Sequence, residues 1–233
     1  MARIDGRAAD QLRPVEIIPN FNKFAEGSCL IRCGNTQVLC CASVEERTPP
    51  HVPEGEGWVT AEYSMLPRAN RERSKRDIAK LKLSPRSAEI QRLVGRSLRA
   101  CVDMKKLGER TVTIDCDVLQ GDGGTRTASV TGGYVALALA LKKVGAADAL
   151  VDQVAAVSAG IVDDQLLLDL CYEEDSSAQV DLNCIMTGDG KLVEIQGTGE
   201  GRAFTVEEQR ALVDLCAKGI AQLQTIQKNV LEG

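Results

Sequence analysis

The stretch "TVTIDCDVLQGDGGTRTASVTGGYVALALALKK", residues 111–143, carries the strongest folding signals in this chain. Its first nine residues alternate apolar and polar side chains, which predicts a half-buried strand over 111–119. Its last part, from about 127 to 144, is apolar nearly all round, which predicts a helix that is covered on several sides. The glycine-rich loop between them therefore joins a strand directly to a buried helix.

This loop has the composition of an anion site. Gly121, Gly123 and Gly124 let the backbone bring its N–H groups close to a ligand, and the start of a helix favours negative charge. Thr125 adds a hydroxyl and Arg126 a planar fork suited to phosphate oxygens. The loop is neither the lysine-containing nucleotide loop nor the dinucleotide fingerprint. The residues leave two readings open, a phosphate seat or a plain turn with a surface arginine.

A second arginine lies at another expected helix start. Ser84 is suited to cap a helix and Pro85 to its first position, and apolar residues recur at helical spacing from Ile90 to Val102. Arg86 lies in the first turn of this helix. Arg86 and Arg126 could therefore converge on one anion.

The rest of the chain repeats the order of strands followed by a helix. This order predicts an α+β fold of two similar halves that share one core. A capping box of Thr205 and Glu208 predicts a final helix of about 20 residues. The other expected elements are two strands over 28–44 with a turn at Gly34-Asn35, a strand over 59–67, strands over 155–162, 166–172, 179–187 and 191–197, and a loop over 173–178.

An acidic pair follows in the last third. Asp175 lies in the expected loop, and Asp181 begins a strand in which it shares a face with Asn183. Such carboxylates can hold Mg²⁺ beside a phosphate, although an ordinary acidic surface turn would read the same way. Glu173 and Glu174 are expected to be solvated.

The segment "PRANRERSKR", residues 67–76, is a strong local positive field in a chain of net charge −5. It suits a nucleic-acid backbone, but no aromatic residues are interleaved to stack on bases. A solvated loop or a subunit contact is the alternative. Its basic residues are Arg68, Arg71, Arg73, Lys75 and Arg76.

The amino-acid composition narrows the cellular location and the type of catalysis that we expect. The nine cysteines show no zinc-like spacing and lie in apolar segments, so we expect reduced, buried thiols in a cytoplasmic protein. No secretory signal or membrane-length apolar run is visible, so we expect no membrane partner. His51 is the only histidine and lies alone in a Pro/Gly loop, which argues against a histidine-based nucleophilic triad.

Taken together, these motifs resemble those of the ribonuclease PH family of phosphate-dependent 3′ exoribonucleases, which trim transfer-RNA ends. The resemblance runs nearly from end to end. The matching stretches are "RIDGRAADQLRPVEI", "GNTQVLC", "EGEGWVTAEYSMLPRA", "LSPRSAEIQRLVGRSLRA", "IDCDVLQGDGGTRTASVTGGYVAL", "YEEDSSAQVDLNCIMT" and "VEIQGTGEGRAFT".

The resemblance implies a single ribonuclease PH domain over 1–233, a fold like domain 2 of ribosomal protein S5, made of duplicated βαβα-type units. It implies a homohexameric ring, a trimer of dimers, in which inorganic phosphate releases nucleoside 5′-diphosphates from the 3′ ends of tRNA precursors and other RNA. The reverse reaction would add nucleotides. The implied site residues are Arg86, Gly124, Thr125 and Arg126 for phosphate, Asp175 and Asp181 for catalysis and a divalent metal, Mg²⁺ by expectation, and Arg68, Arg73 and Arg76 for RNA.

Three positions need separate mention. Gln179 and Cys171 stand where many family members carry acidic residues, which puts the metal affinity in question, and Arg99 has no assigned role. Two other functions stay open from the sequence. One is an inactive ring subunit that only binds RNA, which would usually lack some of the site residues. The other is a small-molecule nucleoside phosphorylase, which would leave the basic run without a task.

Overall fold

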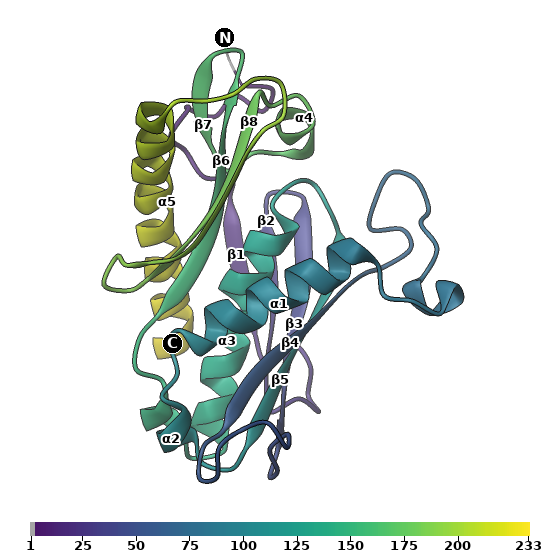
Figure 1. Ribbon diagram of the computed structural model, residues 1–233, viewed down its shortest axis with the longest axis vertical. Helices are drawn as coiled ribbons and strands as arrows, with labels where there is room; N and C mark the ends of the chain where they lie inside the picture. The colour runs from purple at the N-terminus through teal and green to yellow at the C-terminus, as the bar shows by residue number, and fades with distance from the viewer. Residues whose placement is uncertain (1–2) are drawn as a thin grey trace.

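The computed structural model describes residues 3–233, and in this range the strands form two sheets (Figure 1). The larger sheet has the strand order β1-β2-β3-β5-β4, and the smaller sheet has the order β7-β6-β8-β9. The strands of the larger sheet are β1 (Val15–Pro19), β2 (Gly27–Cys33), β3 (Thr36–Glu45), β4 (Trp58–Met65) and β5 (Thr111–Gln120). Those of the smaller sheet are β6 (Val154–Val162), β7 (Gln165–Leu168), β8 (Val180–Thr187) and β9 (Leu192–Gly199).

Five α-helices and two short 3-10 helices complete the described chain. They are α1 (Pro85–Arg99), α2 (Met104–Leu107), α3 (Thr125–Lys143), α4 (Tyr172–Asp175), α5 (Val206–Glu232), η1 (Asp77–Lys80) and η2 (Ala147–Ala149). No helix among residues 3–233 is long and apolar enough to cross a membrane.

The local signals in the sequence explain how the larger sheet is connected. The turn between β2 and β3 uses Gly34 at φ 57°, and the two strands pair antiparallel. β4 and β5 pair in parallel, so the chain between them must cross over the sheet, and α1 lies in this connection. The Ser84 hydroxyl caps α1 by accepting the Ser87 N–H at 3.0 Å, as predicted.

Helix α3 joins the two halves. It packs against β2, β3 and β5 of the larger sheet and against β6 and β8 of the smaller sheet, and most of its residues are buried. Helix α5 covers the smaller sheet along β6, as the yellow helix in Figure 1 shows. Apolar clusters under α3 and under α5 meet at Val15, which packs against both. The predicted α+β class is confirmed.

Several expected boundaries were wrong. Helix α3 begins at Thr125 rather than near 127, because Gly124 adopts φ 64° and its carbonyl accepts the Ala128 N–H at 3.0 Å. The strand expected over 166–172 ends at Leu168, since Asp169 has φ 54° and turns the chain. The loop expected over 173–178 starts as the short helix α4.

Two further elements differ from expectation. The final helix has 27 residues instead of about 20, because its amphipathic pattern continues to Glu232. Strand β1 was not predicted, and its five residues pair with β2.

Candidate active site

A cavity of about 370 Å³ lies where the two halves meet. Residues from the helices α1, α3 and α4 and from the strands β6 and β8 of the smaller sheet line it. All six residues predicted for phosphate, catalysis and metal are among its lining residues. These are Arg86, Gly124, Thr125, Arg126, Asp175 and Asp181.

The glycine loop forms one wall of the cavity. Gly123 and Gly124 have φ of 72° and 64°, a backbone region that side chains with a Cβ rarely adopt. A Cβ on Gly123 would also lie 2.4 Å from the Leu170 carbonyl oxygen, so this loop and the segment before α4 are in direct contact. Helix α3 starts at Thr125, and its first N–H groups lack partners within the helix.

The two predicted arginines lie at the starts of α1 and α3, as the sequence suggested. The Arg126 guanidinium is mostly shielded and donates to Glu89 Oε1 at 3.2 Å and to Gln196 Oε1 at 2.6 Å. Arg86 is exposed to solvent at the rim. The Thr125 hydroxyl is buried against the Tyr63 hydroxyl at 2.8 Å. Two cations and a helix start therefore face one cavity, an arrangement that favours an anion.

The acidic pair faces the same cavity. Burial, together with the nearby Asp175 carboxylate, raises the pKa of Asp181 to about 6, and partial burial raises the pKa of Asp175. The Asn183 amide donates to Asp181 Oδ2 at 3.2 Å. In residues 3–233, Asp181 Oδ1 is buried and has no hydrogen-bond partner.

These residues fit a divalent cation. A buried carboxylate oxygen without a donor, beside a second carboxylate, is an oxygen donor set of the kind that Mg²⁺ and Mn²⁺ prefer. Asp175 and Asp181 would hold the ion.

Five lining residues were not predicted as part of the site, namely Ser158, Ser176, Ala178, Asn183 and Glu200. Ser158 and Asn183 are almost fully buried, and Glu200 comes from the loop after β9. Asn183 had a sequence signal, because it alternates with Asp181 along β8. Ser158 and Glu200 had none, since only the pairing of distant segments brings them to the cavity.

The expectation that Glu174 is solvated was wrong. Arg3 donates to both of its carboxylate oxygens, at 2.8 and 2.7 Å, and both side chains are buried. This ion pair lowers the pKa of Glu174, against the raising effect of its burial. Glu173 is half-buried and pairs with Arg71.

The basic segment does not line the cavity. Arg68, Arg73 and Arg76 are exposed on the chain between β4 and α1. Residues 66–84 are here called the arm. Leu66 and Ala69 attach it to the body next to β5, and the rest of it projects at the right of Figure 1.

Three other singled-out residues also lie outside the cavity. The Gln179 side chain exchanges hydrogen bonds with Asp164, and Cys171 is buried at the start of α4. Arg99 stacks over the Trp58 ring at 4.4 Å and donates to the Val59 carbonyl at 2.9 Å.

Comparison with known sequences identifies the family. Residues 11–143 match domain 1 of the 3′ exoribonuclease family, and residues 152–218 match its domain 2. The chain belongs to the 3′ exoribonuclease family. The predicted family and enzyme class, an exoribonuclease, are thereby confirmed. The single domain over 1–233 stays a prediction.

Two relatives are both named Ribonuclease PH. The protein from Moorella thermoacetica is 55% identical over 99% of this chain and 95% of its own length. The protein from Bacillus pumilus is 55% identical over 98% of this chain and 97% of its own length. Among solved structures, the Archaeoglobus fulgidus exosome with RNA bound to the active site has a chain similar to this one, with a TM-score of 0.79. That chain is 27% identical, and the match covers 96% of this chain and 91% of the other.

Proposed function

We propose that this protein is a phosphorolytic 3′ exoribonuclease that trims tRNA precursors and other RNA 3′ ends. The observation that carries the proposal is the single cavity into which two arginines at helix starts and two carboxylates are gathered. The relatives named Ribonuclease PH and the exosome structure with RNA at its active site support RNA as the substrate.

Inorganic phosphate is the co-substrate in this proposal. Arg86, Arg126, Thr125 and the N–H groups at the start of α3 bind it. A phosphate oxygen attacks the phosphorus of the last phosphodiester, the bond to the 3′ oxygen breaks, and a nucleoside 5′-diphosphate leaves. Because phosphate is already an anionic nucleophile at neutral pH, no histidine base is required.

The carboxylates act on the leaving group. A divalent cation held by Asp175 and Asp181 would stabilise negative charge on the departing 3′ oxygen. Asn183 orients Asp181 through its hydrogen bond to Oδ2. The buried Oδ1, which has no hydrogen-bond partner among the described residues, would be available to bind the ion.

The arm supplies the contact to the rest of the RNA. Arg68, Arg73 and Arg76 are exposed, and no described acidic side chain forms an ion pair with them, so they can bind phosphates of the strand.

A homohexamer and a cytoplasmic location complete the proposal. The nine cysteines, all within the described residues, are free thiols, which suits a reducing compartment. Light scattering tests the assembly, for which we expect a mass of six chains.

The deciding experiment incubates the purified protein with Mg²⁺ and a 3′-tailed tRNA, with and without inorganic phosphate. We expect nucleoside diphosphates only when phosphate is present. The Asp181→Asn variant should bind RNA normally and release almost no nucleoside diphosphate. Monophosphates formed without phosphate would mean hydrolysis, and RNA binding without release would favour an inactive ring subunit. Cleavage of free nucleosides with phosphate but not of RNA would favour the nucleoside phosphorylase.

A further inference from the structure

Asp122 lies in the glycine loop but is not among the residues that line the cavity. Its backbone and side chain make contacts to three other segments. Its N–H donates to Thr36 Oγ1 at 2.9 Å, and its carboxylate accepts from Asn35 Nδ2 at 3.0 Å. The other carboxylate oxygen accepts the backbone N–H of Tyr172 at 3.1 Å.

The contact with Tyr172 connects the proposed phosphate-binding residues to the acidic pair. Tyr172 is the first residue of α4, and Asp175 is the last. Asp122 comes four residues before Arg126 in the loop that starts α3. The Asp122 carboxylate therefore links the loop that carries the phosphate-binding residues to the helix that carries one of the acidic pair.

Neighbouring contacts support the same link. Arg13 donates to the Asp122 carbonyl and also to both carboxylate oxygens of Asp169, at 2.7 and 3.0 Å. Gly123 packs so closely on Leu170 that no side chain fits between them. The loop and the segment 169–172 are thus held at a fixed separation by polar and van der Waals contacts.

We propose that Asp122 is a positioning residue that sets the distance between Asp175 and the phosphate seat, by which we mean the proposed phosphate-binding residues Arg86, Thr125 and Arg126. This inference rests on the proposed phosphorolytic function. When the link is cut, the phosphate seat stays on α1 and α3, while α4 loses an attachment beside the cavity. Phosphate binding is then preserved, and the acidic residue is displaced from the leaving oxygen.

The test compares Asp122→Ala with Asp122→Asn in the phosphorolysis assay. Asp122→Ala should lower kcat by at least about tenfold, since a displacement of ~1 Å can cost ~100-fold, and should leave the KM for phosphate within about twofold. Asp122→Asn keeps an acceptor for the Tyr172 N–H and should restore most of the kcat. A kcat for Asp122→Ala equal to that of the parent, or a loss that Asn does not restore, would overturn the proposal.

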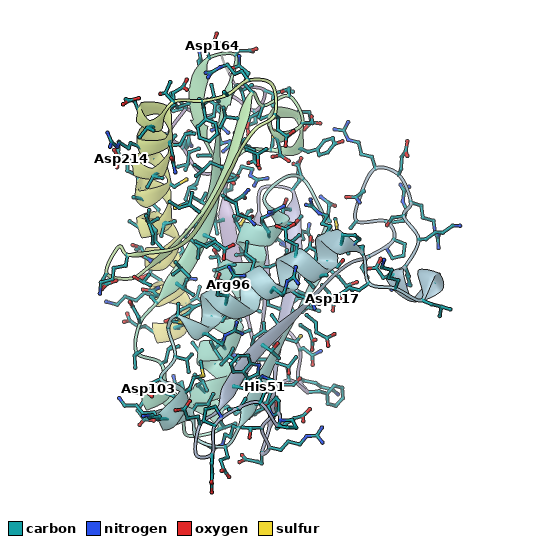
Figure 2. The ribbon with its side chains drawn as sticks, viewed as in Figure 1. His51, Arg96, Asp103, Asp117, Asp164 and Asp214 are labelled. Atoms are coloured by element: carbon teal, nitrogen blue, oxygen red, sulfur yellow. The ribbon has the colours of Figure 1, made fainter. Side chains whose placement is uncertain are left out.

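Two control variants separate positioning from general damage. Asn35→Ala removes the other partner of the carboxylate and should keep the kcat of the parent. Asp214→Asn changes an exposed aspartate that Figure 2 shows on the outer side of α5, and it should have no effect. If Asn35→Ala lowers kcat as much as Asp122→Ala, the turn between β2 and β3 is what matters and the proposal fails.

Hydrogen exchange gives a readout that does not depend on activity. Peptides covering 170–176 should exchange faster in Asp122→Ala than in the parent and Asp122→Asn. Unchanged exchange in Asp122→Ala would show that the carboxylate does not hold α4. If the parent made no diphosphates, the proposed function would fail, and the exchange data would still decide whether Asp122 holds α4.

Discussion

Arg126 is held in place before any ligand arrives. Its Nη1 atom is hydrogen-bonded to Glu89 and Gln196 at the wall of the cavity. We expect Arg126→Lys to raise the KM for phosphate by about tenfold, because lysine keeps the charge but loses the paired hydrogen bonds. Steady-state kinetics at varied phosphate concentration measure the effect.

Arg96→Lys provides the matched control. Arg96 lies on α1 outside the cavity and pairs with Glu194 at 2.8 Å (Figure 2). Its substitution should leave the KM for phosphate unchanged. Equal effects of the two substitutions on the KM for phosphate would show that Arg126 does not bind phosphate.

For single residues, the sequence predicted a place in the site when the residue type and its position in a helix or strand were enough to indicate it. Arg86 and Arg126 at helix starts, and Asp181 on a strand, could be predicted to face a site. Glu174 could not, because its buried partner Arg3 is 171 positions away. Only the folded chain brings such a pair together.

Strand β5 carries a charge arrangement that costs stability. Asp115 is aligned with Glu62 of β4, and like charges on neighbouring strands repel. Burial first, and then Glu62 and Asp117, raise the pKa of Asp115. The folded state thus holds this proton more tightly than the unfolded chain, and stability falls as the pH rises from about 3.8 through the raised pKa.

We therefore expect Asp115→Asn to stabilise the protein at pH 7, by about 0.5 kcal/mol after allowance for solvent screening. The gain should shrink at pH 4, where the parent aspartate is partly protonated. Denaturant unfolding at the two pH values measures the difference, with Asp214→Asn as the exposed control. A gain that is the same at both pH values would rule out titration as its cause.

The arm offers a second prediction at the scale of an element. Replacing Arg68, Arg73 and Arg76 with glutamine should weaken RNA binding and flatten its dependence on salt. If each arginine contacts one phosphate, the slope of log K against log salt should fall in magnitude by about 2. Filter binding over a range of salt concentrations measures this slope. A slope matching the parent would make the arm a structural or subunit-contact element.

The ends of the elements were harder to predict than their presence. The pattern of apolar residues indicated β2, β3, β5, α1 and α3 because each has a long periodic stretch. Strand β7 was predicted too long, because leucines continue on both sides of Asp169 in "LLLDL". In the structure Asp169 has a positive φ and pairs with Arg13, so the chain turns there. The start of α3 was placed late, since a left-handed Gly124 allows the helix to begin directly at Thr125.

Over the whole molecule, Gln227 joins elements from both halves. Its buried amide donates to the Thr131 carbonyl of α3 at 2.9 Å and to the Val154 carbonyl of β6 at 3.0 Å. Gln227→Ala would remove both of these buried hydrogen bonds, so we expect a loss of roughly 1–3 kcal/mol. Gln222→Ala, on the exposed side of the same helix, should change stability by less than about 0.5 kcal/mol.

Thermal unfolding measures both variants. A melting temperature for Gln227→Ala close to that of the parent would show that these bonds contribute little to holding α5 on the molecule. The sequence gives no hint of this role, because a glutamine in a polar stretch of a long helix is normally exposed.

The projecting arm has a practical consequence. Its basic residues at 68–76 are exposed, and trypsin cleaves after lysine and arginine. Limited digestion should therefore cut first within 68–76 and split the chain into pieces of about 8 and 17 kDa by residue count. RNA bound along the arm would shield the peptide bonds within 68–76 from trypsin. The fraction of intact chain left on a gel would then measure RNA binding to the arm without a radioactive label or enzymatic turnover.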